Sequence, residues 1–185
     1  MSVSKSVGIK IAMAASAIGV VLGIALWLRT PNVAEVGGYP PDFTLPAFGV
    51  GPGSRAPIHL SDHRGHVVLV NFWATWCPPC IEETPSLEAL ANNMRNLGVE
   101  VIGVSVDQDP AAIEKFVAGH HLTFPVVRDP DQKVASQYGT FKFPETYILD
   151  RDGRVAEKII GATNWADPQM VSFVENLARP SKAAD

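Results

Sequence analysis

The sequence predicts one α/β domain, with a mixed central sheet and helices on both faces, preceded by one N-terminal transmembrane helix. The domain is predicted because stretches typical of strands alternate with stretches typical of helices and end in a hairpin around residues 150–153. The membrane helix is predicted because residues 11–28 contain no charged side chain. A chain of 185 residues suffices for one domain of about 100–150 residues with an appendage. Its net charge of −4 offers nucleic acid no basic surface.

The charges around the apolar segment predict its orientation. Lys5 and Lys10 precede it, which favours a cytoplasmic location for residues 1–10, although Arg29 on the other side opposes this. A cleaved signal peptide is the alternative, but its apolar region is usually shorter and no small-x-small cleavage pattern follows. We therefore expect an uncleaved, single-pass anchor in the cytoplasmic membrane, with the rest of the chain on the extracytoplasmic (periplasmic) side.

The residues after the anchor predict a linker and then the domain. Residues 29–41 are rich in Pro, Gly and small side chains, as linkers are. The domain is expected over residues 42–180, followed by a short tail over residues 181–185. A short strand is expected at residues 58–60. Residues 67–73 form a nearly continuous apolar run, which is typical of a central strand covered on both faces.

A helix is expected to follow this central strand. It begins near Cys77 and ends at Gly98, and Pro85 inside it should produce a kink. The elements expected after it are a buried strand at 99–106, a helix with one apolar face at 111–119, an extended segment at 124–127, a helical turn or two at 133–138, a hairpin of strands at 146–149 and 154–160, and a closing helix at 168–177.

The two cysteines of the chain, Cys77 and Cys80, lie two residues apart at the start of this helix. A structural disulfide usually joins distant segments, and a four-cysteine zinc site needs a second pair, so the spacing predicts a redox-active dithiol. Unpaired N–H groups and the helix dipole stabilise a thiolate at a helix N-terminus. We expect Cys77 to be exposed and to attack, and Cys80 to point inward and resolve the mixed disulfide. Pro78 and Pro79 pre-set the first helical turn.

Two further residues are candidates from their positions. Glu83 follows Cys80 by three residues, so both lie on one side of the helix, and a carboxylate held near the apolar sheet can accept the Cys80 proton. The alternative is an ordinary acidic residue of a first helical turn, which is our interpretation of Glu82. Pro144 precedes a predicted strand whose ladder it cannot continue, so it is a candidate cis proline, although a trans proline is commoner.

These motifs resemble the thioredoxin superfamily, and within it the membrane-anchored TlpA-like and ResA-like thiol-disulfide oxidoreductases and the thioredoxins of cytochrome c maturation. The resemblance extends over residues 42–177. It is carried by the segments PDFTLP (41–46), VLVNFWATWCPPC (68–80), ETP (83–85), VSVD (104–107) and FPETYILD (143–150). It implies a thioredoxin fold with an extra helix–strand insertion at about residues 110–138.

The resemblance also implies a function and a set of site residues. It implies a reductase of oxidised exported proteins such as apocytochrome c, supplied by a membrane electron donor of the thiol-relay type, with no cofactor and no metal. It implies catalytic roles for Cys77, Cys80 and Glu83. Partner contacts are implied for Trp76, Pro78, Pro79, Phe143, a cis Pro144 facing the dithiol, and Glu145, which would share an acidic patch with Glu83. Asn71 replaces the buried aspartate of cytoplasmic thioredoxins and cannot relay a proton, so that duty falls on Glu83 or water.

Direction and two other functions are left open. The C-x-x-C motif does not by itself set a potential, and we favour a reductant over an oxidant. A peroxiredoxin shares the Asp-Phe-Thr-Leu-Pro start, but Thr75 stands two residues before Cys77 and the tryptophan-flanked dithiol fits poorly. A copper chaperone would use soft thiolates, but with wider cysteine spacing and a downstream histidine. We expect the histidines of the chain to be solvated rather than metal-bound, namely His59, His63, His66, His120 and His121.

Overall fold

The computed structural model describes residues 33–48 and 56–179. The predicted cytoplasmic segment (1–10), anchor (11–28) and tail (181–185) lie outside these residues. In the two described stretches, no helix has both the length and the hydropathy needed to cross a membrane.

Six strands form one mixed sheet in the order β2-β6-β5-β4-β7-β8. All seven residues of the central strand, β4 (Val67–Trp73), are buried, as the apolar run predicted. This strand is parallel to β5 (Val99–Ser105) and antiparallel to β7 (Glu145–Leu149). The outer strands are β6 (Val126–Arg128), β2 (Ala47–Phe48) and the edge strand β8 (Val155–Ile160), and a separate two-stranded sheet pairs β1 (Thr44–Leu45) with β3 (Ile58–His59).

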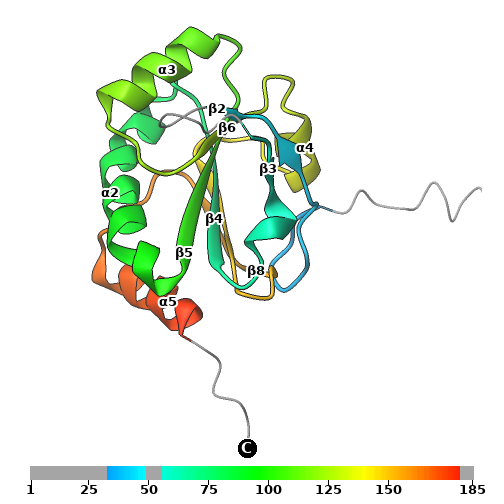
Figure 1. Ribbon diagram of the computed structural model, residues 1–185, viewed down its shortest axis with the longest axis vertical. Coiled ribbons are helices and arrows are strands. Elements are labelled where there is room, and N and C mark those ends of the chain that lie inside the picture. The colour runs from blue at the N-terminus through cyan, green and yellow to red at the C-terminus, as the bar shows by residue number, and fades with distance from the viewer. Residues whose placement is uncertain (1–32, 49–55, 180–185) are drawn as a thin grey trace, which may run out of the picture. The chain divides into compact units, whose positions relative to one another are not determined.

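Helices cover both faces of the sheet. Helix α2 (Pro78–Met94) and helix α5 (Pro168–Ala178) lie together on one side of it, and the short helix α4 (Lys133–Tyr138) lies on the other (Figure 1). The region predicted as an insertion forms helix α3 (Pro110–Gly119), β6 and α4. Two 3-10 helices, η1 (Leu60–His63) and η2 (Arg95–Leu97), complete the elements. The arrangement is the predicted thioredoxin-like fold.

Three helices begin in the same way, with a capping side chain followed by proline. Asp109 accepts a hydrogen bond from the N–H of Ala111 at the start of α3, and Asp167 caps α5 in the same way. Cys77 takes this position in α2. At the other end, α2 continues into η2 and stops at Gly98, whose φ of 78° lies in the left-handed region. The predicted stop at Gly98 is therefore confirmed.

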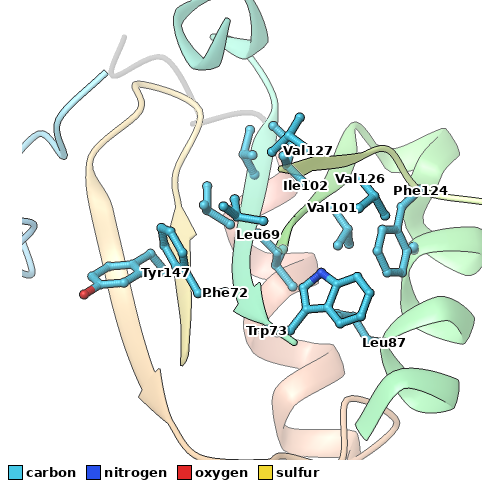
Figure 2. Packing of buried hydrophobic residues seen from close by; sticks show 14 of the residues in the cluster. Leu69, Phe72, Trp73, Leu87, Val101, Ile102, Phe124, Val126, Val127 and Tyr147 are labelled. Carbon is cyan, nitrogen blue, oxygen red and sulfur yellow. The ribbon is translucent and has the colours of Figure 1, made fainter. Parts of the chain in front are cut away.

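The core consists of one apolar layer on each face of the sheet. Successive residues of β4 point to opposite faces, so Phe72 and Trp73 belong to different layers. Figure 2 shows Phe72 beside Tyr147 on one side of β4, and Trp73 beside Leu87 on the side of α2. The ring centroids of Phe72 and Tyr147 are 6.0 Å apart, in an edge-to-face arrangement. Site residues whose side chains point to opposite faces of the sheet are therefore separated from one another by the sheet.

The described part of the predicted linker is attached to the domain. The N–H of Gly37 donates to the carbonyl oxygen of Val155 at 2.7 Å, and the N–H of Val155 donates to the carbonyl of Gly38 at 2.9 Å. The guanidinium of Arg154 lies 4.3 Å from the centre of the Tyr39 ring. The segment thus pairs with the start of the edge strand β8, a long-range contact that its Pro- and Gly-rich composition did not indicate.

One carboxylate on β5 is paired with two histidines. Nδ1 of His63 contacts Oε2 of Glu100, and Nδ1 of His66 lies 3.7 Å from Oε1 of the same group. The hydrogen bond raises the pKa of His63 above its usual 6.5, and the same bond lowers the pKa of Glu100 below its usual 4.5. Both imidazoles are partly exposed, so the pair is screened by solvent.

These two shifts predict a pH window of stability. The contribution of His63 is complete below its usual pKa of 6.5 and is lost as the pH rises through the folded-state value. The contribution of Glu100 is present above 4.5 and is lost as the pH falls through its folded-state value. We expect His63→Gln to lower the free energy of unfolding by up to about 1 kcal/mol near pH 5.5 and by less near pH 8.5.

Urea unfolding at these two pH values measures the effect. His59→Gln is the control, because His59 bonds to Thr44 and not to a carboxylate. Equal losses from His63→Gln at both pH values would contradict the prediction.

Candidate redox-active site

Cys77 and Cys80 are joined by a disulfide bond at the start of α2, with their Cα atoms 5.3 Å apart. Cys77 is the N-cap residue of the helix, and its Sγ accepts a hydrogen bond from the N–H of Cys80 at 3.3 Å. The predicted position of Cys77 at the helix N-terminus is therefore confirmed. In the reduced protein, the same N–H and the helix dipole stabilise a thiolate at this sulfur.

Cys77 is less exposed than predicted. It is 5% exposed and Cys80 is 1% exposed, so the expectation of an exposed Cys77 is wrong for the disulfide form. The reason is that its sulfur is turned toward Cys80 by both the disulfide and the capping hydrogen bond. The order of the two exposures still agrees with an outer and an inner sulfur. Neighbouring Trp76 is 62% exposed, so a large apolar side chain stands at the surface next to Cys77.

A buried carboxylate fixes the loop that leads from β4 to the dithiol. Oδ2 of Asp107 accepts hydrogen bonds from the N–H of Thr75 at 2.9 Å and from the hydroxyl of Ser105 at 2.7 Å. Oδ1 accepts from the hydroxyl of Thr75 at 2.6 Å. Since Thr75 precedes Cys77 by two residues, Asp107 determines how the chain enters the first turn of α2. No motif in the sequence indicated this role for Asp107.

Glu83 is buried between α2 and the sheet and is held by three donors. Its Oε1 accepts from Nδ2 of Asn71 at 2.9 Å. Its Oε2 accepts from the backbone N–H of Thr163 at 3.1 Å and from Nε1 of Trp165 at 3.4 Å. Nδ2 of Asn71 also donates to Oγ1 of Thr146 at 2.8 Å, so one amide joins α2 to β4 and β7.

The surroundings of Glu83 suit a proton acceptor. Burial raises the pKa of Glu83, as predicted, and the hydrogen bonds from Thr163, Asn71 and Trp165 oppose that rise. All three partners donate, so they favour the carboxylate form. Glu83 also borders a surface pocket of about 370 Å³, together with Ser86, Ala162 and other residues of α2 and the 162–164 segment. The pocket places the carboxyl group near solvent although the side chain is buried.

The segment before β7 lies next to the loop that carries Trp76 and the dithiol. The Phe143–Pro144 peptide bond is cis, as the resemblance implied. The Phe143 ring lies edge-on to the Trp76 ring, with centroids 6.1 Å apart. Phe141, in the same segment, is 74% exposed. We call the side chains of Trp76, Pro78, Pro79, Phe141 and Phe143 the apolar rim of the site.

Glu145 lies on the opposite face of the sheet from Glu83. Thr146 shares the Asn71 donor with Glu83, so Glu145, as its neighbour in the strand, points the other way. The side chain of Glu145 is fully buried and its Oε1 lies 2.5 Å from Nζ of Lys158. The expectation that it shares an acidic patch with Glu83 is wrong, and so is direct partner contact by its carboxylate.

Sequence reasoning missed three residues that hold the two glutamates. Thr163 and Trp165 bond to Glu83 from 80 and 82 residues away, and Lys158 pairs with Glu145 from the next strand. No motif marks them, because each acts through a contact made only in the folded chain. The one available signal was that a buried carboxylate requires donors. Across the described residues, no group of three or more His, Cys, Asp or Glu is placed to hold a metal ion.

Comparison with known proteins gives consistent matches. The model of the AhpC/TSA family matches residues 36–158. The thiol-disulfide oxidoreductase ResA of Bacillus thuringiensis is 39% identical over 116 residues, which are 63% of this chain and 67% of the relative. ResA of Geobacillus kaustophilus is 36% identical over 137 residues, which are 74% and 75%. A solved structure from Chlorobium tepidum, provisionally assigned as the thiol:disulfide interchange protein DsbE, matches with a TM-score of 0.66 and 28% identity over 78% of this chain and 95% of that one.

The Asn71–Glu83 contact predicts the effect of a second carboxyl group. Asn71→Asp places an acidic oxygen where the 2.9 Å donor now lies, and two buried carboxylates in contact cannot both ionise. The folded-state pKa of the pair then rises, so the folded protein binds more protons and stability falls as the pH rises. We expect a loss of about 2–4 kcal/mol near pH 8 and a smaller loss near pH 5.

Urea unfolding across this range measures the loss. Asn92→Asp is a matched control, because Asn92 also donates to a glutamate, Glu88, but at an exposed site. The account is contradicted if Asn71→Asp shows the same small, pH-independent effect as Asn92→Asp.

Proposed function

We infer the function from one premise: this chain belongs to the AhpC/TSA family and is a thiol-disulfide oxidoreductase of the ResA type, with Cys77 and Cys80 as its redox pair. We propose that it works as a reductase of disulfides in exported proteins such as apocytochrome c. It acts outside the cytoplasm, and a membrane donor of the thiol-relay type returns its disulfide to the dithiol. The observation that carries the proposal is a helix-capping Cys77 joined to Cys80, with Glu83, a buried carboxylate whose pKa is raised, three residues further along the same helix.

Reduction proceeds by two exchanges. The Cys77 thiolate attacks one sulfur of the substrate disulfide and forms a mixed disulfide, while the other substrate sulfur leaves as a thiolate. Cys80 then gives its proton to Glu83 and attacks Sγ of Cys77. The second substrate sulfur leaves, and water protonates the substrate thiolates. Two electrons have passed to the substrate, and the Cys77–Cys80 disulfide seen in the structure is the oxidised product.

The surroundings of the dithiol support a protein substrate. The apolar rim provides exposed aromatic surface next to Cys77, which suits an extended or unfolded polypeptide. The extracytoplasmic location is supported by the charge-free segment 11–28 and the lysines before it. A peroxiredoxin is not favoured, because Thr75 gives both its N–H and its hydroxyl to Asp107 rather than facing a lone cysteine.

Trapping tests the two cysteine roles. In Cys80→Ala the resolving thiol is absent, so a mixed disulfide on Cys77 should persist with an oxidised protein substrate. Non-reducing electrophoresis and mass spectrometry of the adduct detect it. Cys77→Ala is the control and should capture little. The assignment of roles is wrong if Cys77→Ala traps substrate while Cys80→Ala does not.

A second prediction concerns the proton acceptor. Glu83→Gln cannot take the Cys80 proton, so we expect resolution of the mixed disulfide to slow by about 10²-fold and to lose the pH dependence that Glu83 supplies. Stopped-flow tryptophan fluorescence across pH 5–9 measures this step. Glu82→Gln is the matched control, since Glu82 is the exposed neighbour. Equal rates in the two variants would show that water alone accepts the proton.

A further inference from the structure

An ion pair between a fully buried carboxylate and a partly exposed lysine lies on the face of the sheet opposite Glu83. Nζ of Lys158 on β8 is 2.5 Å from Oε1 of Glu145 and 4.9 Å from the centre of the Tyr147 ring. Lys158 is paired with Tyr147 in the β7–β8 register, so the sheet itself brings the ammonium to the carboxylate. Burial opposes the charged form of Lys158, but the hydrogen bonds with Glu145 and Tyr147 prevail and raise its pKa.

Stability alone does not explain why the Glu145 carboxylate is buried. Removing a carboxylate from water is costly, and an apolar residue of similar size often serves as well or better. Within the described residues, Oε2 of Glu145 has no hydrogen-bond partner, and neither has the hydroxyl of Tyr138 in the same cluster. A polar cluster with unpartnered atoms is a poor means of stabilising a core. A role in placing nearby backbone accounts for it better.

The ion pair is connected to both ends of the segment 139–144. The hydroxyl of Tyr147 lies 2.8 Å from Oε1 of Glu145 and 2.6 Å from the carbonyl oxygen of Tyr138. Because the hydroxyl has one proton, it donates a hydrogen bond to one of these two oxygens at a time. It also accepts a hydrogen bond from the hydroxyl of Thr140 at 3.3 Å. Tyr138 and Thr140 stand at the beginning of the segment, and Glu145 directly follows its end.

This segment carries part of the apolar rim. Phe141 is 74% exposed, and the ring of Phe143 lies against that of Trp76, next to Cys77. The cis Pro144 ends the segment. A cluster that holds both ends of the segment therefore also constrains the exposed Phe141 and the position of the Phe143 ring against Trp76, next to Cys77.

We propose that Lys158 is a positioning residue for partner docking: paired with Glu145, it holds segment 139–144 so that Phe141 and Phe143 meet a protein substrate. This rests on the proposed function, because docking a protein is the reason to hold the segment. Lys158 takes no part in the exchange of sulfurs. A small disulfide, which needs no docking surface, therefore reacts independently of Lys158.

The test compares a protein and a small disulfide as substrates of the full-length protein. We expect Lys158→Met to raise the KM for insulin, with dithiothreitol as electron donor, by about tenfold while kcat stays within about twofold. The rate with hydroxyethyl disulfide should stay within about twofold as well. Lys158→Arg, which keeps the charge, should restore the KM. Glu145→Gln combined with Lys158→Met leaves no unpaired buried charge, so its KM should be lower than that of Lys158→Met alone.

A matched control separates positioning from attraction between charges. Lys115 is an exposed lysine of α3, outside both segment 139–144 and the Glu145 cluster, and Lys115→Met removes one charge without touching Glu145. It should leave the KM for insulin unchanged.

Three results would overturn the inference: an unchanged KM in Lys158→Met, equal slowing with both disulfides, or equal effects of Lys115→Met and Lys158→Met. If the unaltered protein reduces hydroxyethyl disulfide but not insulin, the proposed function fails and this inference fails with it. If the unaltered protein reduces both disulfides and Lys158→Met has the same KM for insulin, only this inference fails. Circular dichroism shows whether each variant is folded. If Lys158→Met alone is unfolded, the double variant, which has no unpaired buried charge, replaces it in the comparison of the two disulfides.

Discussion

The amide of Asn71 is the contact on which the site depends. From the centre of β4 its nitrogen donates to Glu83 on α2 and to Thr146 on β7, so it joins the catalytic helix to two strands. Buried polar atoms must be satisfied, and this requirement fixes the rotation of α2 about its axis. With Glu83 turned to the sheet, Cys80, three residues earlier, also faces inward. Cys77 is left at the helix N-terminus. The attacking and resolving roles that we propose for the two sulfurs thus depend on the orientation of α2 against the sheet.

The sheet separates two tasks. On the face covered by α2 and α5 lie the dithiol helix and Glu83, the carboxylate that we propose accepts a proton (Figure 1). On the face covered by α4, Glu145 is neutralised by Lys158 and is tied to the segment that carries part of the apolar rim. Because neighbouring residues of a strand point to opposite faces, the side chains of Glu145 and Thr146 lie on different faces of the sheet although they are adjacent in sequence. The proposed proton acceptor and the proposed docking segment are therefore tied to opposite faces of the sheet.

Local patterns predicted most of the fold. The apolar run of β4, the glycine after η2 and the hairpin of β7 and β8 all have short-range signals, and each was found where expected. The dithiol and the burial of Glu83 followed from spacing. What spacing could not supply were contacts between distant segments: Trp165 on Glu83, Lys158 on Glu145, and Gly37 on the edge of β8. The low solvent exposure of Cys77 could not be predicted from spacing either, because the capping hydrogen bond and the disulfide turn its sulfur inward.

The proposed function depends on electrons passing from the Cys77–Cys80 dithiol to a substrate disulfide. A helix-capping Cys77 lowers the free-energy cost of a thiolate, and in the proposed mechanism Glu83, whose pKa is raised, takes the proton of the inner thiol. The most direct test is equilibration of the Cys77–Cys80 pair with glutathione or dithiothreitol buffers, read by tryptophan fluorescence. A reductase should have a potential below about −220 mV, toward the −270 mV of thioredoxin. A potential near about −120 mV, that of a strong oxidant, would contradict the account.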